Sequence, residues 1–265
     1  MSGIEPRGAV VVVTGAGSGI GAAVAERFAR LGAVVVASDI DEATAKDIAE
    51  RCRAHGARAH SYQCDVADGE AVAALAKSVN SEVGDVDILV NNAGVGVGGP
   101  FLDTTEDDWT WLRSINIDGV VHGCRSFGAT MAARRRGQIV NIASGAAYLP
   151  NRRMATYCAS KAAVVAFSRS LRADFSSQRV GVSVICPGVI NTPILYNTRL
   201  RGTAISEKDR LSRVFSISHS PNAVAKAVTT AAARDRAMVS VGFETQLGYH
   251  ALRLMPVLNG LVARL

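Results

Sequence analysis

Apolar runs and helical patterns alternate along nearly the whole chain of 265 residues. Short runs rich in Val, Ile and Ala predict strands, and segments that repeat Ala, Leu and Val every three or four residues predict helices. The expected strands are 9–14, 33–38, 58–63, 87–91, 138–143, 180–186 and 238–241, and the expected helices are 19–31, 42–55, 68–82, 106–135, 156–178 and 222–234. Strands separated by helices pair in parallel through right-handed crossovers. We therefore expect one α/β domain over residues 1–265, with a mostly parallel, seven-stranded sheet covered by helices on both faces.

Two segments depart from this alternation. Residues from about 190 to 220 mix large apolar side chains with arginines, and long irregular insertions of this kind are typical of substrate lids. Residues from about 244 to 265 form an amphipathic tail, in which Pro256 interrupts a stripe of leucines. The stripe consists of Leu254, Leu258, Leu261 and Leu265. We expect this tail to dock on the domain, and contact with a membrane surface is the less favoured alternative.

Composition and charge do not indicate a nucleic-acid partner. The chain is 48% hydrophobic and 20% charged, as is usual for a soluble globular protein. Its net charge of +6 raises the question of nucleic acid. However, the densest basic run, Arg134 to Arg136, stands just before Gly137, where cations suit a helix C-terminus. We therefore expect no nucleic-acid partner.

Cysteines and histidines give no sign of a metal site or a disulfide framework. The five cysteines are widely spaced without a CxxC pair, and the five histidines form no HExxH pattern. The N-terminal residues MSGIEPRG also lack the features of a signal peptide. These observations predict a cytoplasmic protein without a bound metal.

A glycine-rich loop follows the first predicted strand. The sequence TGAGSGIG supplies Thr14, Gly15, Ser18, Gly19, Ile20 and Gly21. Small residues at this position let a pyrophosphate approach the N–H groups and the positive dipole end of the next helix. Glycines alone can also mark a tight strand-to-helix turn, so the loop is informative only in its context. The expected fold is thus a doubly wound Rossmann domain with a bound dinucleotide.

The second predicted strand ends at Asp39, which favours NAD over NADP. A carboxylate at this position accepts hydrogen bonds from the adenosine ribose hydroxyls and repels a 2′-phosphate. The nearest downstream cation is Lys46, and Ser18 rather than a basic residue lies in the glycine loop. The alternative is that Asp39 caps the following helix, although Asp41 is the better candidate for that cap.

Polar residues also follow the third and fourth predicted strands. Asp65 and Val66 end the third strand, and Asn92, Ala93 and Gly94 follow the fourth. In an open parallel sheet the ligand lies at the carboxyl ends of the strands. We therefore expect these residues to contact the cofactor, although NNAG alone could be a turn.

Ser144, Tyr157 and Lys161 form the most informative cluster. Tyr157 and Lys161 are one helical turn apart and lie on the same face. A phenol with a pKa of about 10 is hardly ionised at pH 7, but a cation about 4 Å away lowers the pKa by roughly three units. The sequence therefore predicts Tyr157 as an acid/base, with Ser144 orienting the substrate oxygen.

The chain resembles a classical short-chain dehydrogenase/reductase from about Val10 to Pro193. The motifs TGAGSGIG, Asp39, DV, NNAG, SINIDG, Ser144, YCASK and PGVINTP occur in the order and spacing of that family. The resemblance implies that Asn116 completes a catalytic tetrad with Ser144, Tyr157 and Lys161 and holds a water at a helix irregularity. It further implies that Tyr157 and Lys161 contact the cofactor and that a segment after the sixth strand holds its carboxamide. This segment contains Pro187, Gly188, Ile190 and Thr192.

These observations predict an oxidoreductase that moves a hydride between NAD(H) and a carbinol or carbonyl carbon. The residues of the expected pocket walls, 95–102, 145–150 and 194–215, favour a hydrophobic secondary alcohol or ketone. The alternatives are a protein that senses NAD(H) without turnover and a methyltransferase, which has no use for YxxxK. The family resemblance implies a homodimer or homotetramer, although the C-terminal tail departs from the family pattern.

Overall fold

The computed structural model describes residues 3–149, 151–206 and 218–254. A seven-stranded sheet has the order β3-β2-β1-β4-β6-β7-β9, and every pair of neighbouring strands is parallel. Its strands are β1 (Val10–Thr14), β2 (Val34–Asp39), β3 (Ala59–Gln63), β4 (Ile88–Asn91), β6 (Gly137–Ile142), β7 (Val180–Pro187) and β9 (Met238–Val241). All seven predicted strands are confirmed, and each predicted end lies within one residue of the observed end.

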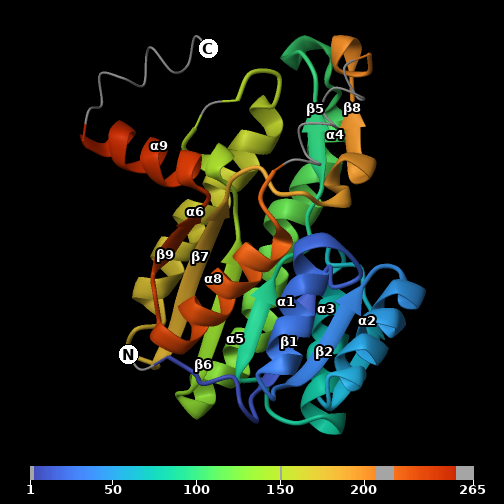
Figure 1. Cartoon of the computed structure of the whole chain (residues 1–265), viewed down its shortest axis with the longest axis vertical. Helices are drawn as coiled ribbons and strands as arrows, with labels where there is room; N and C mark the ends of the chain where they lie inside the picture. The colour runs from blue at the N-terminus through green and yellow to red at the C-terminus, as the bar shows by residue number, and fades with distance from the viewer. Residues whose placement is uncertain (1–2, 150, 207–217, 255–265) are drawn as a thin grey trace.

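Helices cover both faces of this sheet (Figure 1). One face carries α1 (Gly19–Arg30), α2 (Glu42–Ala54) and α8 (Pro221–Arg234), and the other carries α3 (Gly69–Glu82), α5 (Gly119–Arg134) and α6 (Ala155–Asp174). Strand β1 shows how the sequence produces two cores. Val11 and Val13 pack toward the first group of helices and Val12 toward the second, because successive side chains of a strand point to opposite faces. The doubly wound Rossmann architecture is therefore confirmed.

The helix predicted over 106–135 is interrupted. It consists of α4 (Glu106–Arg113), a π-helical turn η2 (Ser114–Asp118) and α5. A π-helical turn holds one more residue than an α-helical turn, and such turns occur often at functional sites. The helix irregularity that the resemblance implied around Asn116 is at this position.

A second, small sheet was not predicted. Strand β5 (Gly96–Gly98) pairs in parallel with β8 (Thr198–Leu200), which lies inside the predicted lid. Short 3₁₀ turns flank these strands, namely η1 (Phe101–Asp103), η4 (Pro193–Asn197) and η5 (Gly202–Ala204). Both strands extend from the main sheet beside α4 (Figure 1). Residues 207–217 of the predicted lid lie outside the described residues.

The predicted C-terminal tail begins as helix α9 (Phe243–Leu254). Thr245 is buried, whereas Phe243, Leu247 and Leu254 are exposed, so α9 docks on the domain by one side only. The remaining tail residues, 255–265, lie outside the described residues. No helix in the described ranges is long and apolar enough to cross a membrane.

Candidate functional site

The predicted site residues gather at the carboxyl ends of the parallel strands. The strand order reverses between β1 and β4, which are neighbours in the sheet. The glycine loop leaves β1 at this point, and residues 92–94 leave β4 beside it. A crevice at such a reversal is the usual ligand site of open α/β sheets.

The glycine loop presents an open helix N-terminus. Gly15 and Gly19 have positive φ values of 61° and 54°, and a Cβ atom on Gly21 would collide with the carbonyl oxygen of Gly15. Ser18 is the N-cap residue of α1, yet its side chain makes no capping hydrogen bond, and the first turn contains no acidic residue. The free N–H groups and the helix dipole therefore favour an anionic ligand such as a pyrophosphate.

Asp39 lies beside this loop at the end of β2. Its Oδ2 atom accepts a hydrogen bond of 2.8 Å from the Gly17 N–H, and its Oδ1 atom accepts one of 3.1 Å from the Asp41 N–H. Asp41, not Asp39, caps α2 by accepting from the N–H groups of Ala43 and Thr44. The choice of Asp41 as the helix cap is thus confirmed, and the carboxylate of Asp39 borders the glycine loop.

Thr14 and Asn92 join the ends of β1 and β4. The Asn92 Nδ2 atom donates to the carbonyl oxygens of Thr14 and Gly15, at 3.0 and 2.9 Å. The Thr14 Oγ1 atom accepts from the N–H groups of Asn92 and Ala93, at 3.1 and 3.3 Å. The NNAG segment therefore fixes the position of the glycine loop through hydrogen bonds to its backbone.

The remaining predicted cofactor residues lie around this crevice. Asp65 is exposed after β3 and accepts from the Ala67 N–H at 2.9 Å, whereas Val66 is buried. Residues 187–192 cross from β7 toward α1, where a Cβ atom on Gly19 would lie 3.1 Å from the side chain of Thr192. Ile190 is buried and forms a backbone bridge to His219. Segment 187–192 therefore reaches from the end of β7 to the glycine loop.

Ser144, Tyr157 and Lys161 converge at the end of β6. Ser144 precedes the 3₁₀ turn η3 (Gly145–Ala147), and its side chain forms a hydrogen bond with Tyr157. Lys161 lies one turn further along α6, with its Nζ atom 5.7 Å from the centre of the Tyr157 ring. The Nζ atom donates to the Ile142 carbonyl oxygen at 3.2 Å. This arrangement places a hydroxyl, a phenol and an ammonium group side by side.

Burial shifts the pKa values of Tyr157 and Lys161. Desolvation raises the pKa of Tyr157, and the hydrogen bond from Ser144 offsets this effect only in part. Desolvation also lowers the pKa of Lys161 to about 8. The expectation that Lys161 lowers the phenol pKa is therefore wrong in this structure. The reason is that both groups are desolvated, while the ammonium group is directed at the carbonyl oxygen of Ile142.

Asn116 lies in η2 and is fully buried. Its Oδ1 atom accepts from the Val95 N–H at 2.9 Å, and its Nδ2 atom donates to the Val95 carbonyl oxygen at 3.0 Å and to Ser160 Oγ at 3.2 Å. A Cβ atom on Gly94 would lie 3.2 Å from Asn116 Oδ1 and 3.4 Å from Lys161 Nζ. The structure therefore brings Asn116 close to the other three predicted catalytic residues.

Sequence reasoning missed two buried polar clusters. In the first, Asn91 donates to Asn141 at 2.8 Å and Asn141 donates to Ser168 at 2.9 Å, which joins β4, β6 and α6. The signal was an Asn inside the apolar run of residues 138–143. In the second, Asp108 is fully buried and forms a capping box with Thr105. Its signal was the spacing of an N-cap Thr and an acid three residues later.

Similar sequences support the oxidoreductase interpretation. The family model described as "short chain dehydrogenase" matches residues 9–201. The chain is 42% identical over 273 aligned residues to the probable oxidoreductase EphD of Mycobacterium tuberculosis. The alignment covers 98% of this chain and 46% of that protein. The chain thus spans about half the length of this relative. It is also 38% identical to the meso-2,3-butanediol dehydrogenase of Serratia marcescens, over 69% of this chain and 72% of that protein.

Solved structures with the same fold bind nicotinamide cofactors. A short-chain dehydrogenase/reductase from Burkholderia phymatum, in complex with NAD, superimposes with a TM-score of 0.86 at 33% identity, over 95% of this chain and 96% of that one. A putative gluconate 5-dehydrogenase from Beutenbergia cavernae, with bound NADP, gives a TM-score of 0.79 at 31% identity, over 91% and 97%. Sequence, fold and site geometry agree: the chain belongs to the short-chain dehydrogenase/reductase family of oxidoreductases.

Proposed function

We propose that this protein transfers a hydride between NAD(H) and the carbinol or carbonyl carbon of a hydrophobic secondary alcohol or ketone, with Tyr157 as acid/base. The observation that carries the proposal is the hydrogen bond between Tyr157 and Ser144, with Lys161 Nζ 5.7 Å from the phenol ring. These groups lie at the same edge of the sheet as the open helix N-terminus of the glycine loop. A proton donor and a dinucleotide site at one edge are what this reaction needs.

Each residue of the tetrad has a distinct role in this proposal. Ser144 donates a hydrogen bond to the substrate oxygen, and Tyr157 exchanges a proton with that oxygen. Because burial raises its pKa, Tyr157 is protonated at neutral pH and is ready to donate its proton during ketone reduction. Lys161 contributes its positive charge, and Asn116 orients a water that reconnects the phenol with solvent.

The cofactor site suits NAD. The first turn of α1 has unused N–H groups for the pyrophosphate, and NAD supplies the hydride acceptor. Asp39 supports the choice of NAD over NADP, because its carboxylate lies 2.8 Å from the Gly17 N–H in the loop and would repel a 2′-phosphate. Ile40, which follows it, is 61% exposed and offers no cation.

The competing function is NAD(H) sensing without turnover. Catalysis is favoured because the phenol has a hydrogen-bonded partner and an ammonium group nearby, which a sensor does not require. Two relatives define a range of substrates to test, the butanediol dehydrogenase above and the human epidermal retinol dehydrogenase 2. The latter is 37% identical to this chain over 70% of this chain's length. We further propose that the chain works as a homodimer or homotetramer in the cytoplasm.

A cofactor absorbance assay tests this proposal. The protein is incubated with NAD or NADP and a panel of small diols and larger apolar secondary alcohols, and formation of the reduced nicotinamide is recorded. We expect turnover with NAD, greatest for apolar alcohols. Tyr157→Phe, which removes only the phenol oxygen, should lower kcat by about 10² to 10⁴ and leave the Kd of NAD unchanged. Wild-type turnover in Tyr157→Phe would refute the assigned mechanism.

A further inference from the structure

The segment 193–206, called the arm below, follows the proposed carboxamide segment and runs along β5. Gly99, which directly follows β5, allows the two backbones to approach closely. Gly99 has a φ of 149°, and a Cβ atom on it would lie 2.7 Å from the Arg201 carbonyl oxygen. The Arg201 N–H in turn donates to the Gly98 carbonyl oxygen at 2.8 Å. Backbone pairing therefore fixes one side of the arm.

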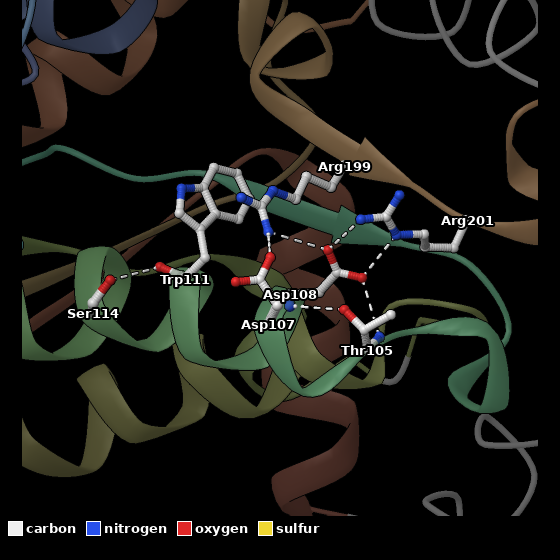
Figure 2. Close-up of polar contacts among 7 residues, drawn as sticks. All are labelled: Thr105, Asp107, Asp108, Trp111, Ser114, Arg199 and Arg201. Atoms are coloured by element: carbon white, nitrogen blue, oxygen red, sulfur yellow. Dashed lines mark hydrogen bonds and ion pairs between the residues drawn. The ribbon is translucent and has the colours of Figure 1, made fainter.

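An ion pair fixes the other side of the arm to α4 (Figure 2). Arg201 donates from Nε and Nη2 to the two carboxylate oxygens of Asp108, at 2.8 and 2.7 Å. Asp108 also accepts from the Thr105 N–H at 3.1 Å and from Arg199 at 3.3 Å. A two-point guanidinium–carboxylate contact defines orientation as well as distance. Because Asp108 is fully buried, its charge depends on these partners.

Arg199 adds a second contact between the arm and α4. Its guanidinium lies over the ring of Trp111, 4.1 Å from the ring centre, and its Nη1 atom is 2.6 Å from Asp107 (Figure 2). A guanidinium stacked on an indole ring excludes water from that ring face. Trp111 therefore reports whether the arm is in contact with α4.

The same helix leads directly into the catalytic residues. Helix α4 continues as η2, which holds Asn116, and Asn116 binds both backbone polar groups of Val95, the residue before β5. Asp108 is therefore linked to the arm in two ways. Helix α4 connects it through Asn116 and Val95 to β5, which pairs with β8 of the arm. Its own side chain binds Arg201, which directly follows β8. The arm and Asn116 are therefore connected both through α4 and through β5.

We infer that Asp108 and Arg201 are positioning residues, which hold the arm against α4 and so set the geometry of the substrate site relative to Asn116. This inference rests on the proposed oxidoreductase function for its kinetic consequence. Its structural consequence, the attachment of residues 193–206 to α4, is independent of any turnover. The pair contacts neither the glycine loop nor Asp39, so cofactor affinity should be insensitive to it.

Fluorescence tests the attachment directly, because the sequence contains two tryptophans and both lie on α4. In a Trp109→Phe background, emission comes from Trp111 alone. We expect Arg201→Gln and Asp108→Asn to raise acrylamide quenching of Trp111 at least about twofold. The matched control is Glu106→Gln, which neutralises an exposed carboxylate in the first turn of α4 and should leave quenching unchanged. Equal quenching in all variants would overturn the inference.

Kinetics test the positioning role. Arg201→Gln should raise the KM for the alcohol about tenfold and leave the Kd of NAD unchanged. Arg201→Lys keeps the charge but loses the two-point contact, so its substrate KM should lie between that of the unmodified protein and that of Arg201→Gln. A wild-type substrate KM in both variants would overturn the positioning role. If the unmodified protein shows no turnover, the proposed function fails, and quenching still decides whether the pair attaches the arm.

A variant with one unpaired buried charge can fail to fold. The double variant Asp108→Asn with Arg201→Gln answers this case, because two neutral amides can hydrogen-bond without leaving a buried charge. We expect it to fold, as judged by circular dichroism, and to show raised Trp111 quenching and a raised substrate KM. If the folded double variant matches the unmodified protein in both measurements, the ionic contact has no positioning role.

Discussion

Helices α1 and α4 begin in opposite ways. At α1 the side chain of Ser18 makes no cap and the first turn has no acidic residue, so the N–H groups stay available. At α4 the side chains of Thr105 and Asp108 close a capping box, and Arg199 and Arg201 cover the carboxylate of Asp108. The first helix end is left open for a ligand, whereas the second is satisfied within the protein.

The buried charge of α4 differs in a similar way from the buried charge among the proposed catalytic residues on α6. Hydrogen bonds from Arg201 hold the pKa of Asp108 well below its usual range, so that this carboxylate is fully ionised. Lys161, by contrast, bonds to a backbone carbonyl, and burial lowers its pKa to about 8. Polar groups at the proposed ligand site are thus less completely paired than those that hold the scaffold. Three experiments separate these two classes of group.

The largest effect is expected at Asp39, in the open region. Asp39→Ala with Ile40→Arg removes the repulsion of a 2′-phosphate and adds a guanidinium that can bind it. Each change is worth about 1 to 3 kcal/mol, so the ratio of kcat/KM for NADP to that for NAD should rise at least tenfold. The ratio is measured with one alcohol substrate. An unmodified enzyme that already prefers NADP would contradict the assignment of Asp39.

The next effect concerns the stability cost of Lys161. Its folded pKa of about 8 lies below the unfolded value of 10.5, so the buried ammonium destabilises the folded protein at neutral pH. This cost is full below pH 8 and disappears as the pH rises to about 10.5. Lys161→Met should therefore raise the free energy of unfolding at pH 7 by up to about 3 kcal/mol, while turnover is lost.

Urea unfolding at pH 7 and pH 10.5 measures this difference. The control is Lys77→Met, because Lys77 is an exposed lysine on α3 and its removal should change the free energy of unfolding by less than about 0.5 kcal/mol. A Lys161→Met protein that is less stable than the unmodified one at pH 7 would show that the ammonium is stabilised by its surroundings.

The smallest effect compares the two helix ends themselves. Thr105→Ala removes a cap that accepts from the Asp108 N–H at 3.1 Å, and it should cost about 1 kcal/mol of stability. Thr105→Ser retains the capping hydroxyl and should preserve most of this stability. Ser18→Ala removes no capping bond and should change the free energy of unfolding by less than about 0.5 kcal/mol. Equal losses at both positions in thermal unfolding would refute the contrast between α1 and α4.

The sequence predicted the sheet well because buried parallel strands have a strong signature. The valines of β1 face helices on both sides, so this strand is a continuous apolar run. The glycine loop, Asp39 and the Tyr157–Lys161 spacing depend on local sequence order. They could therefore be assigned to one edge of the sheet before any coordinates, and Asp41 could be assigned as the cap of α2.

The arm and the pKa directions depend on tertiary contacts instead. Strands β5 and β8 have only three residues each and contain Gly, Thr and Arg, which is too short and too polar for a strand signal. Arg201 and Asp108 are far apart in sequence, so no spacing rule pairs them. The raised pKa of Tyr157 comes from burial, which the phenol–lysine spacing does not reveal.

The N-terminal residues and α1 pack against α8, which lies late in the chain, and this has a consequence during synthesis. The Ile4 N–H donates to the Ala232 carbonyl oxygen at 2.9 Å, and Arg27 of α1 donates to Thr229 of α8 at 2.9 Å. Helix α1 lies against α8 (Figure 1), although nearly two hundred residues separate them. A nascent chain therefore carries the glycine loop on a helix with one uncovered face until α8 has left the ribosome. During translation, the nucleotide-binding element is made first and covered last.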